Sequence, residues 1–225
     1  MALLASSGYD SLIEVELATG KINWHWFAWE NGFNPDEDGM WLAATNEAKK
    51  KYQSEGKNTI LIHPNEYGEQ GLLISRRSAH PNCAVYENNT GDFILCSIGA
   101  HGNIYRISKK TGEAEILIDW LSTMPHGLKK HFSHWYVTNT TKGEFWKLDQ
   151  EYKPLECYSF SSLEGKPIGY ESTEWLQQVV PISKDKYMAI DSNRAIYCID
   201  LNKKQYSEYN INQNYCVQDI LVFNG

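Results

Sequence analysis

Four polar side chains stand at one equivalent position of a repeated hairpin. Each lies nine residues before the apolar start of a strand, counting the last of them through the C-terminus back to Met1. Equivalent strands that face one axis would bring these side chains together. The four residues are His63, His126, Gln178 and Asp219, which precede Leu72, Trp135, Tyr187 and Leu3.

Imidazole, carboxylate and amide groups are suitable ligands for a divalent transition metal such as Zn, Fe or Mn. An open coordination position would polarise a carbonyl or activate water, which is chemistry for a lyase, a cyclase or a hydrolase. His80 is a further candidate ligand, because it stands in an HPN motif like that of His63. Two other interpretations stay open: a metal-free pocket for a polar substrate, and turn histidines whose rings bond a neighbouring carbonyl.

A second type of ion site is suggested by the segment that begins at Asn34. Its Asp36, Asp38 and Gly39 resemble the first half of a calcium loop, although Thr45 stands where such a loop has a bidentate Glu. The alternative is the N-terminus of a helix. The cofactor expectation is therefore a divalent metal (Zn, Fe, Mn or Ca) and no organic cofactor, since the P-loop and Rossmann fingerprints are absent from the sequence.

Three further residues could take part in catalysis. Glu174 could act as an acid or base, Arg77 could clamp a carboxylate or phosphate, and Tyr170 could stack on a sugar or planar ring. Each also has an ordinary role open to it, as a surface carboxylate, an ion pair between blades, or a packing residue. No nucleophile is predicted, because no GxSxG or HExxH motif occurs.

The elements that must position these residues are copies of one hairpin: a short apolar strand, a polar turn and a second strand that runs into another turn. Five copies predict a repeat protein with a period of about 45 residues, the size of propeller blades. The composition of 225 residues, with 14 Tyr, 8 Trp, 7 Phe and 16 Gly, is typical of many short strands and tight turns. The copies start at Leu3, Leu72, Ile94, Trp135 and Tyr187.

The two ends of the chain complete one blade when they are joined in sequence. Placing residues 217–225 before Met1 gives a continuous hairpin pattern, and such a pairing would remove the free edges of the terminal strands. We therefore predict an all-β fold, a β-propeller formed as a single domain by residues 1–225. Five blades are expected, with four as the alternative.

Residues 30–58 interrupt the hairpin pattern. Acidic residues at 36–38 precede an amphipathic stretch that ends near the basic run 49–51, which matches the polarity of a helix dipole. We predict one inserted helix near 40–53.

Two stretches, GYDSLIEVELATGKINW (8–24) and HPNEYGEQGLLISRRS (63–78), resemble blades of the β-propeller superfamily. Similar blades occur in plant-type glutaminyl cyclases, virginiamycin-type lyases and arylsulfotransferase-like proteins. At the level of the blade outline the resemblance extends over nearly the whole chain and implies a propeller fold. It implies no functional residue, because propellers with unrelated activities share this outline.

Charge and cysteine usage restrict the partners and the compartment. The net charge of −7 argues against nucleic acid, and no stretch has the roughly 18 apolar residues of a membrane helix. The start MALLASSGYD lacks the basic region of a signal peptide, and five scattered cysteines predict reduced thiols in a cytoplasmic protein.

The sequence supports two hypotheses about function. In the first, the chain is an enzyme that acts on a small polar molecule at the mouth of the central channel, with metal-dependent lyase, cyclase or hydrolase chemistry of a kind used in biosynthesis. In the second, the same mouth binds a small polar molecule, a peptide or a protein without catalysis.

Overall fold

The computed structural model describes residues 1–36, 38–43, 45–62, 78–121, 124–159, 176–191, 195–212, 217 and 219–220. These residues form two compact units, Met1–Ile116 (unit 1) and Leu117–Gly225 (unit 2). The single domain predicted over 1–225 stays a prediction.

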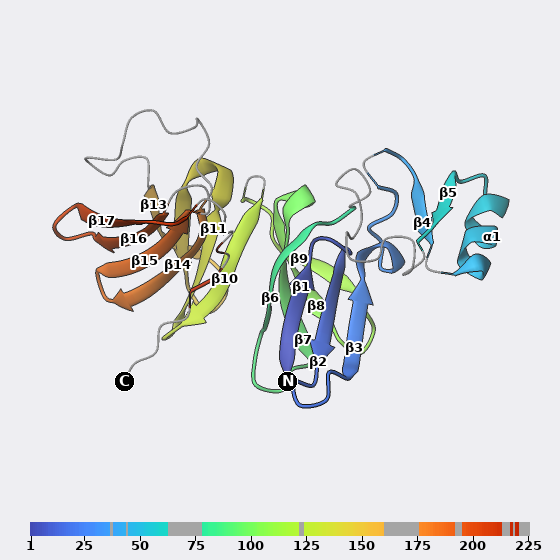
Figure 1. Cartoon of the computed structure of the whole chain (residues 1–225), viewed down its shortest axis with the longest axis horizontal. Helices are drawn as coiled ribbons and strands as arrows, with labels where there is room; N and C mark the ends of the chain where they lie inside the picture. The colour runs from blue at the N-terminus through green and yellow to red at the C-terminus, as the bar shows by residue number, and fades with distance from the viewer. Residues whose placement is uncertain are drawn as a thin grey trace. The chain divides into compact units, whose positions relative to one another are not determined.

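Unit 1 contains two antiparallel sheets in which each strand pairs with the next in sequence (Figure 1). Strand β1 of the first sheet contacts β6 of the second, so the two sheets lie side by side. The first sheet consists of β1 (Ala2–Ser6), β2 (Ser11–Val15) and β3 (Ile22–Phe27). The second consists of β6 (Pro81–Tyr86), β7 (Phe93–Ile98), β8 (Asn103–Ser108) and β9 (Ala114–Ile118).

Unit 2 repeats this arrangement with two four-stranded antiparallel sheets. Strands β10 and β11 of the first both contact β14 of the second. The first sheet consists of β10 (Pro125–His131), β11 (His134–Asn139), β12 (Glu144–Leu148) and β13 (Pro154–Ser159). The second consists of β14 (Leu176–Ser183), β15 (Lys186–Asp191), β16 (Ala195–Asp200) and β17 (Gln205–Asn210).

The repeated hairpin of the sequence is confirmed in four places. The copies that start at Leu3, Ile94, Trp135 and Tyr187 begin β1, β7, β11 and β15 or lie inside them, and the copy at Leu72 falls outside the described residues. A short turn follows β1, β7 and β11, and the residues after β15 (192–194) fall outside the described residues. In two sheets the turn is a 3-10 turn, η4 (Gly99–His101) or η5 (Thr140–Lys142), and it ends at a left-handed glycine, Gly102 or Gly143. Glycine suits that position because it has no Cβ.

In the described part of the chain, the first sheet of unit 1 has three strands, whereas the other antiparallel sheets have four. Strand β1 corresponds to β7, β11 and β15, the second strands of the other sheets, and its hydrogen-bonded neighbour is β2. The residues 217–225 were predicted to supply the missing strand. No pairing of β1 with them occurs among the described residues, and 221–225 lie outside that set, so closure of the ring stays a prediction.

The insertion between β3 and β6 differs in part from the expectation. It contains a helix, α1 (Asn46–Ser54), but residues 41–43 form strand β4 (Trp41–Ala43), which pairs in parallel with β5 (Thr59–Leu61). The helix therefore begins later than the predicted residue 40. Its start is set by Thr45, whose side chain accepts a hydrogen bond from the backbone N–H of Ala48.

The number of blades is not confirmed. Four of the five sheets among the described residues are antiparallel meanders of the blade type, whereas the β4–β5 pair is parallel and joined by a helix. The insertion is therefore not a fifth copy of the hairpin.

The core of unit 1 lies between its two sheets. Leu12, Trp26, Ile94 and Ile98 are buried in it, and burial of each such side chain stabilises the fold by about 1.5–3 kcal/mol. The turn after β8 packs against β3, because the Trp26 indole N–H donates to the carbonyl of Gly112 at 2.9 Å. Gly112 has φ +77°, a conformation that favours glycine, and a Cβ there would lie 2.5 Å from Asn31 Oδ1, so the Asn31 side chain would have to move.

A buried carboxylate joins the two sheets of unit 1 at one end. Asp10 lies in the turn between β1 and β2, and its oxygens accept hydrogen bonds from the backbone N–H groups of Ser78, Ala79 and His80, just before β6. The Ser78 hydroxyl donates a fourth. Asp10 has φ +47°, the left-handed conformation that glycine has in the equivalent turns. Burial raises the pKa of this carboxyl above its ordinary value, against the hydrogen bonds that lower it.

A second polar contact joins the same sheets further along the strands. Glu14 on β2 accepts hydrogen bonds from the Tyr86 hydroxyl at 2.5 Å and the Lys109 ammonium at 2.6 Å. These two bonds lower the pKa of Glu14, Lys109 contributing most. Burial and the neighbouring carboxylate raise the pKa of Tyr86 to about 12.

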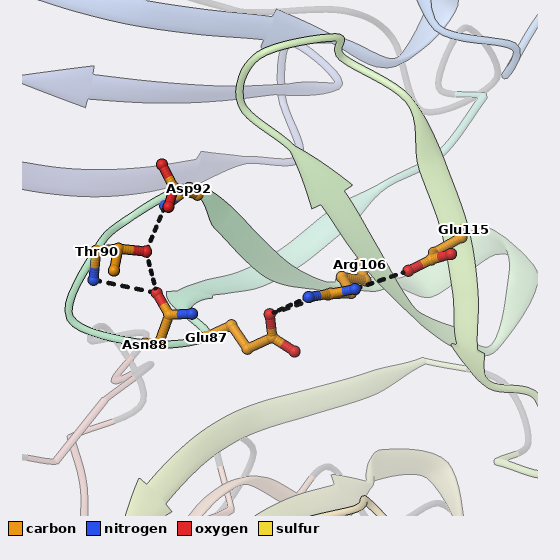
Figure 2. A network of polar contacts seen from close by, with 6 residues as sticks. All are labelled: Glu87, Asn88, Thr90, Asp92, Arg106 and Glu115. Carbon is orange, nitrogen blue, oxygen red and sulfur yellow. Dashed lines mark hydrogen bonds and ion pairs between the residues drawn. The ribbon is translucent and has the colours of Figure 1, made fainter.

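A third network lies within the second sheet and its first turn (Figure 2). The Arg106 guanidinium on β8 contacts the carboxylates of Glu87 at 2.9 Å and Glu115 at 3.3 Å, and it stacks on the ring of Phe93. Thr90 bonds to Asn88 and Asp92 within the turn (Figure 2). This network connects the end of β6 with β8 and β9. Glu87 and Arg106 are partly exposed and Glu115 is exposed, and a structural role is sufficient to explain their contacts.

We expect Asp10→Ala to destabilise the protein by about 3 kcal/mol or more, because it leaves three buried N–H groups without an acceptor. Urea denaturation followed by circular dichroism measures the change. Asp119→Ala removes an exposed carboxylate and is the matched control, with an expected change within about 0.5 kcal/mol. Equal effects of the two substitutions would show that the Asp10 contacts do not hold the sheets.

We expect the stabilising effect of Glu14 to depend on pH in a defined direction. Its folded pKa is lowered, so its contribution is complete above the ordinary value of 4.5 and is lost as the pH falls through the folded pKa. Tyr86 has a raised pKa, so its contribution is complete below pH 10 and is lost as the pH rises towards about 12. The measurement is the difference in unfolding free energy between wild type and Glu14→Gln at acidic pH, and between wild type and Tyr86→Phe at alkaline pH. Because Asp10 is present in wild type and in both variants, its opposite contribution cancels in each difference.

Candidate functional site

The two sheets of unit 2 approach each other closely where β10 meets β14. A Cβ built on Gly127 would lie 2.7 Å from the carbonyl oxygen of Gln177 and 3.0 Å from Cα of Gln178. Such distances exclude any other residue without movement of the backbone, and Gly127 also has φ +59°. The residues beside this contact are polar and buried.

His126, the residue before Gly127, is 6% exposed and its ring is held in one orientation. Its Nδ1 lies 2.9 Å from the carbonyl oxygen of Met124 and 2.8 Å from Oγ1 of Thr140. The Thr140 hydroxyl donates to the carbonyl of Leu176, so Nδ1 must carry the proton that it donates to both oxygens. In the neutral form of the ring, this leaves the lone pair on Nε2.

Gln178 on β14 is 1% exposed and has one end of its amide occupied. Its Oε1 accepts a hydrogen bond from the backbone N–H of Ile220 at 2.7 Å, which fixes which end of the amide is oxygen. The Nε2 group has no hydrogen-bond partner among the described residues. A buried donor left without an acceptor costs about 1–3 kcal/mol, so this position requires an explanation.

Asp219 lies near the same strands and is paired. Its carboxylate forms an ion pair with Lys129 on β10, and its side chain is 55% exposed. His131, two residues further along β10, has its pKa lowered mainly by burial and then by the charge of Lys129, while Asp219 acts in the opposite direction. The Asp219 charge is thus compensated by a lysine.

We define the β10–β14 polar cluster as five buried residues of unit 2 that surround the close approach at Gly127. Thr138 completes the connection, because its hydroxyl lies 3.5 Å from the Gln177 carbonyl. The members are His126, Thr138, Thr140, Gln177 and Gln178.

The strand pairing places His126 and Gln178 at equivalent positions, as the spacing of nine residues predicts. His126 pairs with Thr138, and Gln178 pairs with Ile190, which occupies the same position of its own hairpin. In unit 1 the same spacing gives Val85, but there the equivalent residue is Cys83, which pairs with Ser97. The turn between β6 and β7 is longer than the two-residue turns between β10 and β11 and between β14 and β15. The equivalent residue therefore lies more than nine residues before the apolar start of β7.

Cys83 is one of four cysteines that the described residues contain, and none of the four forms a disulfide within the described part of the chain. Its sulfur lies 3.0 Å from the Ser97 hydroxyl. Burial raises the pKa of the neighbouring Cys96 thiol well above its ordinary value, which favours the neutral thiol.

His80, the reserve metal ligand, lies in unit 1. It has φ +56° and its backbone N–H donates to Asp10 at 2.7 Å, which gives its main chain a defined role in the turn before β6. His63, Arg77, Tyr170 and Glu174 lie outside the described residues.

No group of three or more His, Cys, Asp or Glu side chains in the described part of the chain could hold a metal ion. In the calcium-like segment, Asn34 Oδ1 accepts a hydrogen bond from the backbone N–H of Leu42, and Asp36 Oδ1 accepts from Asp38 and Met40. These oxygens stabilise the turn that leads to β4.

Sequence reasoning missed Thr138, Thr140 and Lys129. Thr140 is the most informative, because it connects His126 to the start of β14, 36 residues further along. The available signal was the run VTNTT at the end of β11, a cluster of hydroxyl and amide side chains directly after an apolar strand.

The blade-type sheets are antiparallel meanders, and within each unit the first strand of one sheet contacts the first strand of the next. This arrangement defines the chain as a β-propeller fold. No protein-family model matches the chain, and no curated protein matches it. Within the part of the chain that the structure describes, no helix has the length and apolar character needed to cross a membrane.

Three solved structures illustrate what the chain resembles. Virginiamycin B lyase from Staphylococcus aureus is 15% identical, with 64% of this chain and 47% of that chain covered and a TM-score of 0.42. The WD40 repeats of RRP9 are 8% identical, covering 92% and 47% at a TM-score of 0.49. A protein of unknown function from Bacteroides caccae is 12% identical, covering 84% and 55% at a TM-score of 0.49. The chain thus spans about half the length of these structures.

Proposed function

We propose that the chain is a ligand-binding propeller protein whose site is the β10–β14 polar cluster. The observation that carries this proposal is the buried Nε2 donor of Gln178, which has no acceptor among the described residues. A ligand oxygen that accepts this N–H would satisfy it. The ligand is therefore a small polar molecule, or the backbone of a peptide, that presents a carbonyl or carboxylate oxygen.

The surroundings of Gln178 favour selective binding. The amide is oriented by Ile220 and the ring of His126 by Met124 and Thr140, so neither side chain needs to reorganise when a ligand arrives. Groups held in place before binding lose little conformational entropy on binding. Burial also strengthens each hydrogen bond that a ligand makes there.

Metal-dependent catalysis is the second candidate, and it rests on His126. A histidine that binds a metal through Nε2 typically donates its Nδ1–H to a carbonyl, as His126 does to Met124. Binding without catalysis is the stronger proposal, because Gln178 Oε1 and the Asp219 carboxylate, two of the expected ligand atoms, already contact Ile220 and Lys129. A metal would need His63 as a further ligand.

We expect a ligand of this class to raise the melting temperature of the wild-type protein and not of Gln178→Met. This substitution roughly keeps the volume of the side chain and removes the Nε2 donor, together with the Oε1 acceptor of the Ile220 N–H. A thermal-shift screen of small amides, carboxylates, sugars and short peptides identifies candidates. A ligand at about 100 times its Kd adds about 2.7 kcal/mol, or roughly 5–10 °C for a chain of this size.

The matched control is Gln53→Met on the exposed surface of α1, which should respond to ligand like wild type. A ligand that shifts wild type and Gln178→Met equally would place the site elsewhere. If no compound of these classes binds the wild-type protein, the proposal is wrong.

The metal candidate has its own test. Element analysis of the purified protein, followed by titration of metal-stripped protein with Zn, Mn, Fe and Ca, is expected to give about one ion per chain, lost in His126→Gln. Metal-stripped protein that neither binds these ions nor gains stability from them would exclude the metal, with the ligand-binding proposal unaffected.

A further inference from the structure

The insertion in unit 1 forms a small α/β lobe, which we define as β4, α1 and β5. Figure 1 shows these three elements side by side. None of the nine residues of α1 is buried, so no apolar core holds the helix. One of its contacts with the strands is an aromatic pair, in which the Tyr52 ring lies 5.0 Å from the Trp41 ring at 58°.

An ammonium group occupies the corner between these two rings. The Nζ atom of Lys57 lies 3.5 Å from the centre of the Trp41 ring and 5.2 Å from that of Tyr52. The Glu55 carboxylate lies 2.6 Å from the same Nζ atom. Two aromatic faces and a carboxylate are the groups with which proteins bind quaternary ammonium compounds.

The chain delivers Lys57 to this corner through a tight turn. The helix ends at Ser54, Gly56 has φ +77°, and the Lys57 N–H donates to the Tyr52 carbonyl at 3.0 Å. These backbone contacts fix the turn without the lysine side chain. The side chain remains 28% exposed, so it can leave the corner by rotation of its own bonds.

We propose that Trp41, Tyr52 and Glu55 form a binding site for a quaternary alkylammonium group, and that Lys57 is an internal occupant which the ligand displaces. A primary ammonium is strongly hydrated, whereas the methyl groups of a quaternary ammonium contact the ring faces directly. Exposed ion pairs and exposed cation–π contacts are both weak, so an external cation can compete with Lys57. This site is independent of the β10–β14 polar cluster.

Two probes carry the same group from different sources: choline chloride as a small molecule, and a short peptide with one trimethyllysine as a partner protein. Both are titrated into the full chain, and the Trp41 indole N–H is followed by NMR, with Trp41→Leu used to assign its signal. We expect a saturable shift in wild type and about tenfold tighter binding in Lys57→Ala, because the internal competitor is gone. Lys57→Arg retains a cation and should not tighten binding.

Lys50→Ala is the matched control, since it removes the same charge from an exposed position of α1. It should bind the probe like wild type. In the Lys57→Ala background, Glu55→Gln should weaken binding. This substitution leaves the aromatic packing and the Trp41 signal intact, so it separates loss of the site from loss of the fold.

The two probes decide the source of the ligand. Tighter binding of choline indicates a small molecule, and tighter binding of the peptide indicates a methylated partner. The proposal is overturned if neither probe shifts the Trp41 signal in wild type or Lys57→Ala, or if Lys57→Ala binds no more tightly than Lys50→Ala.

Discussion

The structure depends on satisfying backbone groups that are buried where one sheet begins beside the next. Ladder hydrogen bonds cannot reach these groups, and each costs free energy if it is left unpaired. In unit 1 the carboxylate of Asp10 accepts the N–H groups of residues 78–80 just before β6. In unit 2 the hydroxyl of Thr140 donates to the carbonyl of Leu176 at the start of β14. Asp10 stands in the turn after β1 and Thr140 in the turn after β11, the strand to which β1 corresponds.

The same constraint explains why the candidate ligand site lies at the β10–β14 contact. Thr140 satisfies Leu176 and at the same time orients His126, so a structural contact also fixes a chemical group. Within this cluster Gln178 differs, because its Nε2 donor is one of several buried side-chain polar atoms that have no hydrogen-bond partner among the described residues. A buried polar group that the fold itself does not satisfy is the strongest indication of a ligand that the described residues provide.

The hairpins were predictable because their signal is local. Alternation of apolar and polar residues with a turn between them predicts β7, β11 and β15 without knowledge of their neighbours. The helix was predicted too early, because Trp41–Ala43 becomes a strand only through pairing with Thr59–Leu61. The equivalence of His126 and Gln178 followed from spacing, and the same spacing gave Val85 where Cys83 stands, because turn length varies between hairpins.

The sequence by itself determined the repeated strand–turn–strand unit, since each strand needs only its own alternation and its own turn. Tertiary structure decided which polar side chains are buried and what they contact. Thr140 meets Leu176 across 36 residues, and Asp10 meets His80 across 70. Such contacts depend on how one sheet packs on the next, a relation that no local pattern encodes.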